Sequence, residues 1–272
     1  MKSSKELKSI IENSLSSFLP EADKYTYVLE ESENYSLSAG GKRLRPCIVL
    51  AVCEMLGGRI EDAVPFAAAL EFIHTYSLVH DDLPAMDNDD FRRGKPSSHK
   101  AYGEDVAILT GDALLTRAFG IMSKEISHDP SQRKAMAMAA IASAAYDMVR
   151  GQISDIKAED SPREEYLDYV HRNKTAALFK AAFASGAYLA DASETELTDM
   201  IDAGTFFGLA FQLYDDLLDL GTDDCLNYAQ VLGKEKTAEK YHGYMNCVLS
   251  TLNKYDNNSA LKELCTIGDI DG

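Results

Sequence analysis

The sequence predicts an all-α protein, a single domain over residues 1–272 with roughly ten helices packed around a central cavity. Apolar residues recur at helical spacing almost throughout, with few of the β-branched alternations that strands show. Asn-Gly and Asp-Gly hairpin signals are absent, apart from Asp271-Gly272 at the end of the chain. No low-complexity linker and no repeat of about 20–50 residues divides the sequence, so one domain is expected.

The expected helices can be followed along the chain. Residues 1–19 place five apolar side chains at helical spacing among Lys, Glu and Ser, which is typical of an amphipathic helix and unlike a signal peptide. Phe72–Val79 and Phe206–Tyr214 are apolar helical stretches, and each leads into an acidic cluster. Segments 135–149 and 175–190, rich in Ala with Leu or Met, indicate two further long helices.

Composition indicates which partners and which location the protein is expected to have. The net charge of −17 argues against nucleic acid as a partner, because phosphate backbones are bound by basic surfaces. The most apolar long stretch, residues 63–79, is interrupted by Glu71 and His74, so the protein is not expected to be embedded in a membrane. Five cysteines, an odd number without a CxxC pair, fit a reducing compartment, and the cytoplasm is the expected location.

Two aspartate clusters are the most informative feature. They are Asp81, Asp82 and Asp87, and Asp215, Asp216 and Asp219. Like charges at the ends of apolar helices repel one another unless something neutralises them. Mg²⁺ is a suitable neutraliser, because it takes a few carboxylates together with waters and substrate phosphates. The two clusters therefore predict a Mg²⁺–phosphate site built from distant segments.

Helix geometry gives the two clusters different shapes. Asp215 and Asp219 are four residues apart and share one helix face. Asp81 and Asp87 are six residues apart, which would place them on different faces of an unbroken helix. Pro84 between them disturbs the helix, so the chain can bring Asp87 back toward Asp81. The acidic motifs lack the Gly and Glu positions of an EF-hand.

Basic residues occur where an anion site needs them. The segment Gly40–Pro46 offers a flexible turn and three cations, Lys42, Arg43 and Arg45. Arg92-Arg93-Gly94 follows the first acidic cluster, and Lys174-Thr175 is expected to open a helix. The P-loop spacing is not found in the sequence.

Together these motifs closely resemble the trans-prenyl diphosphate synthases, specifically the bacterial farnesyl diphosphate synthases. The matching stretches are GGKRLRP (40–46), EFIHTYSLVHDDLPAMDNDDFRRGKPSSH (71–99), GDALLT (111–116), GQ (151–152), KTAALF (174–179) and FQLYDDLLD (211–219). The resemblance implies an isoprenoid synthase fold, usually a homodimer, with two aspartate motifs facing a central active-site cavity. It implies head-to-tail condensation of isopentenyl diphosphate with dimethylallyl or geranyl diphosphate to give farnesyl diphosphate.

The resemblance also implies roles for individual residues. The six aspartates would hold three Mg²⁺ ions on the allylic diphosphate, and Arg92, Lys174, Thr175 and Gln212 would lie against that diphosphate. Isopentenyl diphosphate would bind at Gly41, Lys42, Arg45, His74 and Arg93. The residues with the expected catalytic roles are Asp81, Asp82, Asp215, Asp216, Lys174 and Arg92.

Tyr76, with the small Ser77 beside it, would form the floor of the tail pocket and limit the product to fifteen carbons. His80 is expected to make a structural hydrogen bond.

The chain departs from the family's pattern after Asp219. Relatives continue with a loop that bears lysines before a Thr-Tyr pair, whereas here Leu220–Cys225 leads almost at once into Leu226–Gly233. The usual last helix, with its arginine, is also missing after Leu264. We expect that the given sequence omits residues at these places; a measured mass equal to 29.9 kDa would show that the lysine-bearing loop is truly absent.

Other functions remain open at this point. A geranyl or geranylgeranyl diphosphate synthase would use the same motifs with a tail pocket of another depth. A terpene cyclase needs no isopentenyl diphosphate site, so Lys42 and Arg45 weigh against it. A non-catalytic partner subunit typically loses an aspartate motif, and this chain keeps both.

Overall fold

Helices make up most of the residues that the computed structural model describes, which are 1–158, 163–220 and 226–266. The all-α prediction is confirmed. The α-helices are α1 (Ser4–Leu15), α2 (Tyr27–Leu37), α3 (Leu44–Met55), α4 (Ile60–Asp81), α5 (Ser98–Tyr102), α6 (Glu104–His128), α7 (Gln132–Ile156), α8 (Glu164–His171), α9 (Ala177–Leu189), α10 (Glu194–Leu218), α11 (Tyr228–Leu232), α12 (Lys234–Leu252) and α13 (Ser259–Leu264).

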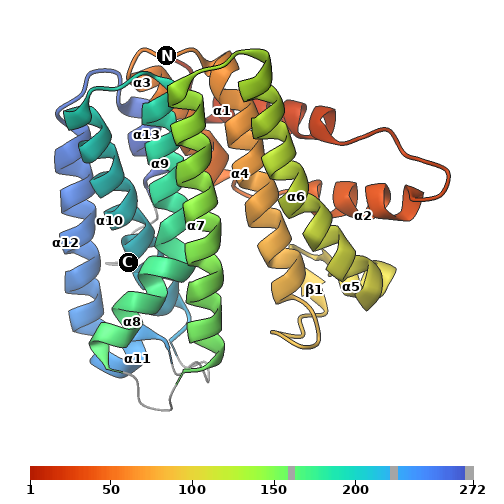
Figure 1. Cartoon of the computed structure of the whole chain (residues 1–272). Coiled ribbons are helices and arrows are strands. Elements are labelled where there is room, and N and C mark those ends of the chain that lie inside the picture. Colours follow the sequence, from red (N-terminus) through yellow and green to blue (C-terminus); the bar gives the residue numbers. More distant parts are fainter. Residues whose placement is uncertain (159–162, 221–225, 267–272) are drawn as a thin grey trace.

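The long helices run side by side, and the chain passes up and down the bundle (Figure 1). α4 packs on α6, α7 packs on α9, and α10 lies between α9 and α12. Large apolar side chains such as Phe66, Phe179 and Phe207 are fully buried between them. The carboxyl ends of α4 and α10 reach the same end of the bundle, at the bottom of Figure 1. This topology brings the two aspartate clusters to one end of the molecule.

The start of α10 is fixed by a capping box. The amide of Glu196 donates to Ser193 Oγ, and the amide of Ser193 donates to Glu196 Oε2 at 2.8 Å. These two bonds satisfy donors that the first helical turn leaves unpaired. The register of α10 is thereby set from its first turn, far from Asp215 at its other end.

A short antiparallel hairpin follows α4, at a place where the sequence has no Asn-Gly or Asp-Gly signal. β1 (Phe91–Arg92) pairs with β2 (Lys95–Pro96), and the turn between them is Arg93-Gly94. Both turn residues have positive φ, 54° for Arg93 and 77° for Gly94. That geometry matches the tight turns preferred between twisted strands, which usually carry Asn-Gly or Asp-Gly. The sequence signal was missed because arginine occupies the first turn position.

Lys174 does not open a helix as predicted. It lies in a π-helical segment, η2 (Arg172–Ala176), which joins α8 to α9 without a break in the helical path. A π-turn contains one residue more than an α-helical turn, and such turns are frequent at functional sites. The position expected to start a helix therefore lies in a π-helical turn inside a longer helical segment.

Helix α6 is distinguished by its hydropathy. Among the described helices it is long and apolar enough to cross a membrane by length and composition, and 33% of its most apolar window is buried. Core helices pass the same test, so this property alone does not indicate a membrane span.

The close approach of α4 and α6 generates a stability prediction. A Cβ atom at Gly111 of α6 would lie 2.0 Å from His80 Nε2, whereas a Cβ at Gly120 of the same helix would meet nothing within 4 Å. His80 Nε2 is itself fixed, because it donates to the carbonyl of Ile108 at 3.0 Å. This hydrogen bond gives His80 the structural role predicted for it.

We expect Gly111→Ala to lower the free energy of unfolding by about 1–3 kcal/mol, because the helices must separate or His80 must move. Gly120→Ala is the matched control, and it should raise the stability by about 0.5–1 kcal/mol through helix propensity alone. Urea denaturation followed by circular dichroism measures both variants. Equal effects of the two substitutions would contradict the close packing described here.

Candidate active site

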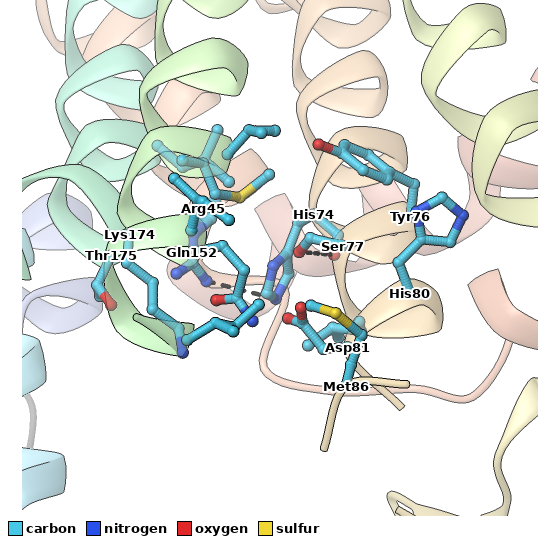
Figure 2. A pocket seen from close by; sticks show the side chains of 16 residues that line it. Arg45, His74, Tyr76, Ser77, His80, Asp81, Met86, Gln152, Lys174 and Thr175 are labelled. Carbon is cyan, nitrogen blue, oxygen red and sulfur yellow. Dashed lines mark hydrogen bonds between the residues drawn. The ribbon is translucent and has the colours of Figure 1, made fainter. Parts of the chain in front are cut away.

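A cavity of about 380 Å³ lies between α4, α7 and the η2–α9 segment. Its polar residues gather at one end, where Asp81, His74, Gln152 and Lys174 point toward one another (Figure 2). The other end is apolar, and Tyr76 lies on that side, with only 6% of its surface exposed. The cavity therefore has a charged head and an apolar tail.

The first aspartate motif is shaped by the end of α4. The helix ends at Asp81, and the amide of Asp87 donates to the carbonyl of Asp81 at 2.9 Å, so the chain after Pro84 does return to the helix end. Asp82 is 2% exposed, and Arg92 donates to its Oδ1 through Nε at 2.9 Å. The hairpin after α4 thus brings a cation against the motif.

The second motif occupies the last turn of α10. The amide of Asp219 donates to the carbonyl of Asp215 at 3.0 Å, so these two residues stack one turn apart as predicted. Asp216 is 4% exposed, and Gln212 Nε2 donates to its Oδ1 at 3.0 Å. The amide of Tyr228 donates to Asp216 Oδ2 at 2.9 Å.

Burial and like charge shift the titration of both motifs. The pKa of Asp81 is raised to about 6, first by burial and then by the neighbouring carboxylates of Asp87 and Asp82, while Lys174 and Arg92 act in the opposite direction. The pKa of Asp215 is also raised to about 6, by burial and by Asp219 and Asp216. A cation that enters the site would stabilise the charged form of these crowded carboxyl groups.

The basic loop at 40–46 separates its three cations. Arg43 is 2% exposed and adopts the left-handed backbone conformation, with a φ of 52°. Its guanidinium donates to Glu71 at 2.7 Å, to Glu12 at 2.9 Å and to the carbonyl of Leu37. All three cations line the neighbouring cavity, but the guanidinium of Arg43 is occupied by these internal partners.

That second cavity, of about 270 Å³, is lined by all five residues expected to bind isopentenyl diphosphate: Gly41, Lys42, Arg45, His74 and Arg93. Arg93 packs so closely on Gly41 that a Cβ there would lie 2.6 Å from the guanidinium carbon. Arg45 and His74 also line the larger cavity, so they form the shared wall.

The shared wall is electrostatically unusual. Arg45 Nη1 lies 3.4 Å from His74 Nε2, and its guanidinium stacks on the ring of Phe179 at 4.2 Å. Burial lowers the pKa of Arg45 to about 10, and burial and the nearby arginines hold the pKa of His74 well below its usual range. His74 is therefore neutral at physiological pH and acts through hydrogen bonds, whereas Arg45 keeps its charge.

Two polar connections reach this site from η2. Lys174 forms an ion pair with Asp155 of α7. Thr175 Oγ1 donates to Gln212 Oε1 at 2.6 Å, and Gln212 in turn donates to Asp216. Two of the predicted diphosphate contacts, Thr175 and Gln212, thus join η2 and α10 in one chain of hydrogen bonds.

The fit of Mg²⁺ can be tested on the donor set. In the described part of the chain, no group of three or more His, Cys, Asp or Glu side chains is arranged to hold a metal ion. Asp82 and Asp216 are held by protein donors. Asp81 and Asp215 are crowded carboxyls with raised pKa values, and hard oxygen donors of this kind suit Mg²⁺ that also binds phosphate. The residues fit an ion shared with a substrate better than an all-protein cage.

Several residues at the site were not given a role from the sequence. Asp155 pairs with Lys174, and Glu71 neutralises Arg43. Gln152 was quoted for the resemblance only, but it lines the larger cavity, and its buried Nε2 has no hydrogen-bond partner among the described residues. Glu71 and Gln152 lie in stretches that match the family, which was the only available signal, and no motif marks Asp155. The unusual segment after Asp219 falls mostly at residues 221–225, and the last residues at 267–272, both outside the described residues.

The raised carboxyl pKa values predict a pH-dependent stability. An acid whose folded pKa lies above its unfolded pKa binds protons more tightly when folded, so stability falls as pH rises from about 4 to about 6. Without metal, Asp215→Asn should therefore raise the Tm by about 2–4 °C near pH 7.5. The gain should shrink toward pH 5, where Asp215 is protonated in the folded protein.

Asp202→Asn, an exposed position on the same helix, is the control for this experiment. Scanning calorimetry in chelator-treated buffer at several pH values measures the shift. An equal Tm change for both variants at every pH would contradict the electrostatic interpretation.

Comparison with known proteins agrees with this geometry. The family model described as Polyprenyl synthetase matches residues 26–265. A geranylgeranyl diphosphate synthase of Cyanophora paradoxa is 45% identical over 240 residues, which cover 86% of this chain and 79% of the relative. A farnesyl diphosphate synthase of Bacillus subtilis is 42% identical over 238 residues, with the same two coverages.

Solved structures give the same result. The apo structure of an FPP/GFPP synthase from Zymomonas mobilis has a TM-score of 0.88 at 31% identity, and 96% of each chain is covered. A geranyltranstransferase from Thermotoga maritima has a TM-score of 0.84 at 35% identity, again over 96% of each chain. The chain therefore belongs to the polyprenyl synthetase family and is a prenyltransferase of the trans-prenyl diphosphate synthase type.

Proposed function

We propose that this enzyme condenses isopentenyl diphosphate with dimethylallyl and then geranyl diphosphate, head to tail, and releases farnesyl diphosphate. The observation that carries the proposal is the pair of adjoining cavities that share Arg45 and His74. One cavity has a charged head and an apolar tail, and the other is lined mainly by cations, with Glu71 beside them. A two-substrate reaction between diphosphates needs such a pair.

The allylic substrate would occupy the larger cavity. Its diphosphate would lie at the end marked by Asp81 and Lys174, and its hydrocarbon would extend toward Tyr76. Isopentenyl diphosphate would bind next to it, where Lys42 and Arg93 supply positive charge and Gly41 leaves room for the guanidinium of Arg93. The proximity of the two sites would turn an encounter between substrates into a step within one complex.

Mg²⁺ is the proposed cofactor, with three ions expected, and the six aspartates of the two motifs would hold it. When bound, it would neutralise the diphosphate and so make it a better leaving group. The protein's own cations act in the same direction. Lys174 and Arg92 pair internally with Asp155 and Asp82, and could exchange these partners for phosphate oxygens.

The remaining chemistry requires mainly that the two substrates are positioned and that water is excluded from the site. Apolar residues such as Met148 and Leu178 line the larger cavity and would keep water from the allylic cation. His74 lines both cavities and would lie near the reacting atoms, but its depressed pKa makes it a weak base. The departing diphosphate would take the proton that is lost from the condensed product.

The product length is proposed from Tyr76. This residue lies five positions before Asp81, roughly 7–8 Å along the axis of α4. Its ring is buried and packs edge-on against His80, with 5.7 Å between ring centroids. A fixed aromatic ring at this depth would stop a growing chain. The relatives bear both farnesyl and geranylgeranyl names, so the fifteen-carbon product rests on this residue.

Homodimer formation is a further part of the proposal. Ile108 and Leu109 on α6 and Tyr146, Val149 and Ile153 on α7 are exposed apolar residues. We take these side chains as the candidate interface, because exposed apolar patches typically mark one. Val149 and Ile153 also line the larger cavity, so a second copy would help to close it. We retain the cytoplasm as the proposed location, because the sequence has an odd number of cysteines and no CxxC pair.

The reaction is tested with purified protein, isopentenyl diphosphate, dimethylallyl or geranyl diphosphate, and Mg²⁺. We expect Asp81→Asn to lower kcat by about 100- to 1,000-fold, because preorganised charge at the diphosphate is lost. Asp202→Asn should leave turnover unchanged. Near-full activity of the Asp81 variant would remove the metal assignment, and a wild-type protein that yields no prenyl product would refute the proposed function.

Product length is tested by two opposing substitutions on α4. Tyr76→Ala should deepen the tail pocket and shift the product toward geranylgeranyl diphosphate without abolishing the first condensation. Ser77→Phe should fill the same pocket and shift the product toward geranyl diphosphate, since Ser77 also lines it. Chromatography of the dephosphorylated alcohols gives the ratio of chain lengths. Farnesyl diphosphate as the sole product of Tyr76→Ala would show that another wall sets the length.

A further inference from the structure

We propose that Asn227 and Tyr228 are positioning residues that hold Asp216 and so set how strongly the second aspartate motif responds to Mg²⁺. The proposal rests on the proposed function of that motif. Both residues are 1% exposed, and both contact Asp216 across the chain segment that follows α10.

Asn227 fixes the backbone at the end of α10. Its Nδ2 donates to the carbonyl of Asp216 at 2.8 Å, while its Oδ1 accepts from the amide of Gln230 at 3.0 Å. The last carbonyls of a helix have no partner within the helix and need one from outside. One side chain therefore satisfies the end of α10 and caps the start of α11, which makes the two helices a single unit.

Tyr228 fixes the carboxylate. Its amide donates to Asp216 Oδ2 at 2.9 Å, and Gln212 donates to the other oxygen at 3.0 Å. His171 Nε2 lies 3.5 Å from Oδ2. The side chain of Asp216 is thus held from both oxygens, and Asp215, the adjacent residue, is held with it on the last turn of α10.

The ring of Tyr228 is anchored in turn by an ionic cluster between α8 and α12. The hydroxyl lies 2.8 Å from Glu164 and 3.2 Å from Asp168, and it accepts from Lys240. Lys240 also donates to Asp168 at 2.8 Å and to Glu164 at 3.0 Å. Because this cluster fixes the position of Tyr228, it also fixes the amide that holds Asp216.

Partners that orient metal ligands typically change metal affinity or activity by about 10- to 100-fold when they are removed. A misplaced Asp216 would tilt the turn that carries Asp215 and Asp219. The effect should therefore appear as a higher Mg²⁺ requirement in a folded protein, which a purely structural contact would not cause.

The experiment compares Asn227→Asp, Asn227→Ser and Tyr228→Phe with wild type. Asn227→Asp keeps an acceptor for Gln230 but places a carboxylate against the Asp216 carbonyl, whereas Asn227→Ser keeps both a donor and an acceptor. Tyr255→Phe is the matched control: its hydroxyl donates to Asp199 at 2.7 Å beside Lys254, at the other end of α12. It removes the same kind of bond far from the motif.

Two readouts are taken as Mg²⁺ is varied. The first is the rise in Tm with inorganic diphosphate present, and the second is turnover in the prenyl transfer assay. We expect Asn227→Asp to raise the Mg²⁺ midpoint about 10-fold or more in both, with a smaller rise for Tyr228→Phe. Asn227→Ser and Tyr255→Phe should stay close to wild type.

The proposal is overturned if Asn227→Asp and Tyr228→Phe have the midpoints of Tyr255→Phe, or if wild type shows no Tm rise with Mg²⁺ and diphosphate. If Asn227→Asp does not fold, the Mg²⁺ midpoint of Tyr228→Phe is compared with that of Tyr255→Phe, and this comparison alone tests the proposal. A wild type with a Tm rise but no prenyl product would refute the proposed reaction, while the Tm midpoints of the variants would still decide the positioning role.

Discussion

A buried cation, Arg43, joins the segments on which the site is built. Its guanidinium reaches Glu12 of α1, Glu71 of α4 and the last carbonyl of α2, while its own backbone begins the turn into α3. Removing one partner from a buried ion pair costs about 3–5 kcal/mol, because the other charge is left unpaired. Lys42 directly precedes this anchor and Arg45 lies in the first turn of α3 just after it, so the anchor helps to hold the backbone that carries both.

The charges around the cavity balance one another before any substrate is present. Arg92 pairs with Asp82, and Lys174 pairs with Asp155. A diphosphate would compete with these carboxylates for the same cations, and Mg²⁺ would compensate the carboxylates that are released. Binding of anion and metal should therefore be coupled, because either one alone leaves like charges facing each other in a poorly solvated site.

The sequence predicted the fold and the location of the acidic clusters because both depend on local spacing. Phe72–Val79 and Phe206–Tyr214 are helical, and Asp81 and Asp215 follow them at the same end of the bundle. Other features depend on contacts between distant segments. Nothing in GGKRLRP distinguishes the internal Arg43 from Lys42, because Glu12 and Glu71 come from other helices. Asp155 is likewise an ordinary helical residue until η2 brings Lys174 to it.

The π-turn at Arg172–Ala176 has a consequence for how this sequence can vary. The turn holds one residue more than a regular helical turn, so loss of a single residue there would give a straight helix from α8 into α9. Each residue of a helix turns by about 100°, and such a deletion would rotate Lys174 relative to the α9 side chains beyond it. A descendant with that deletion could keep the bundle intact and yet lose the pairing of Lys174 with Asp155 or of Thr175 with Gln212.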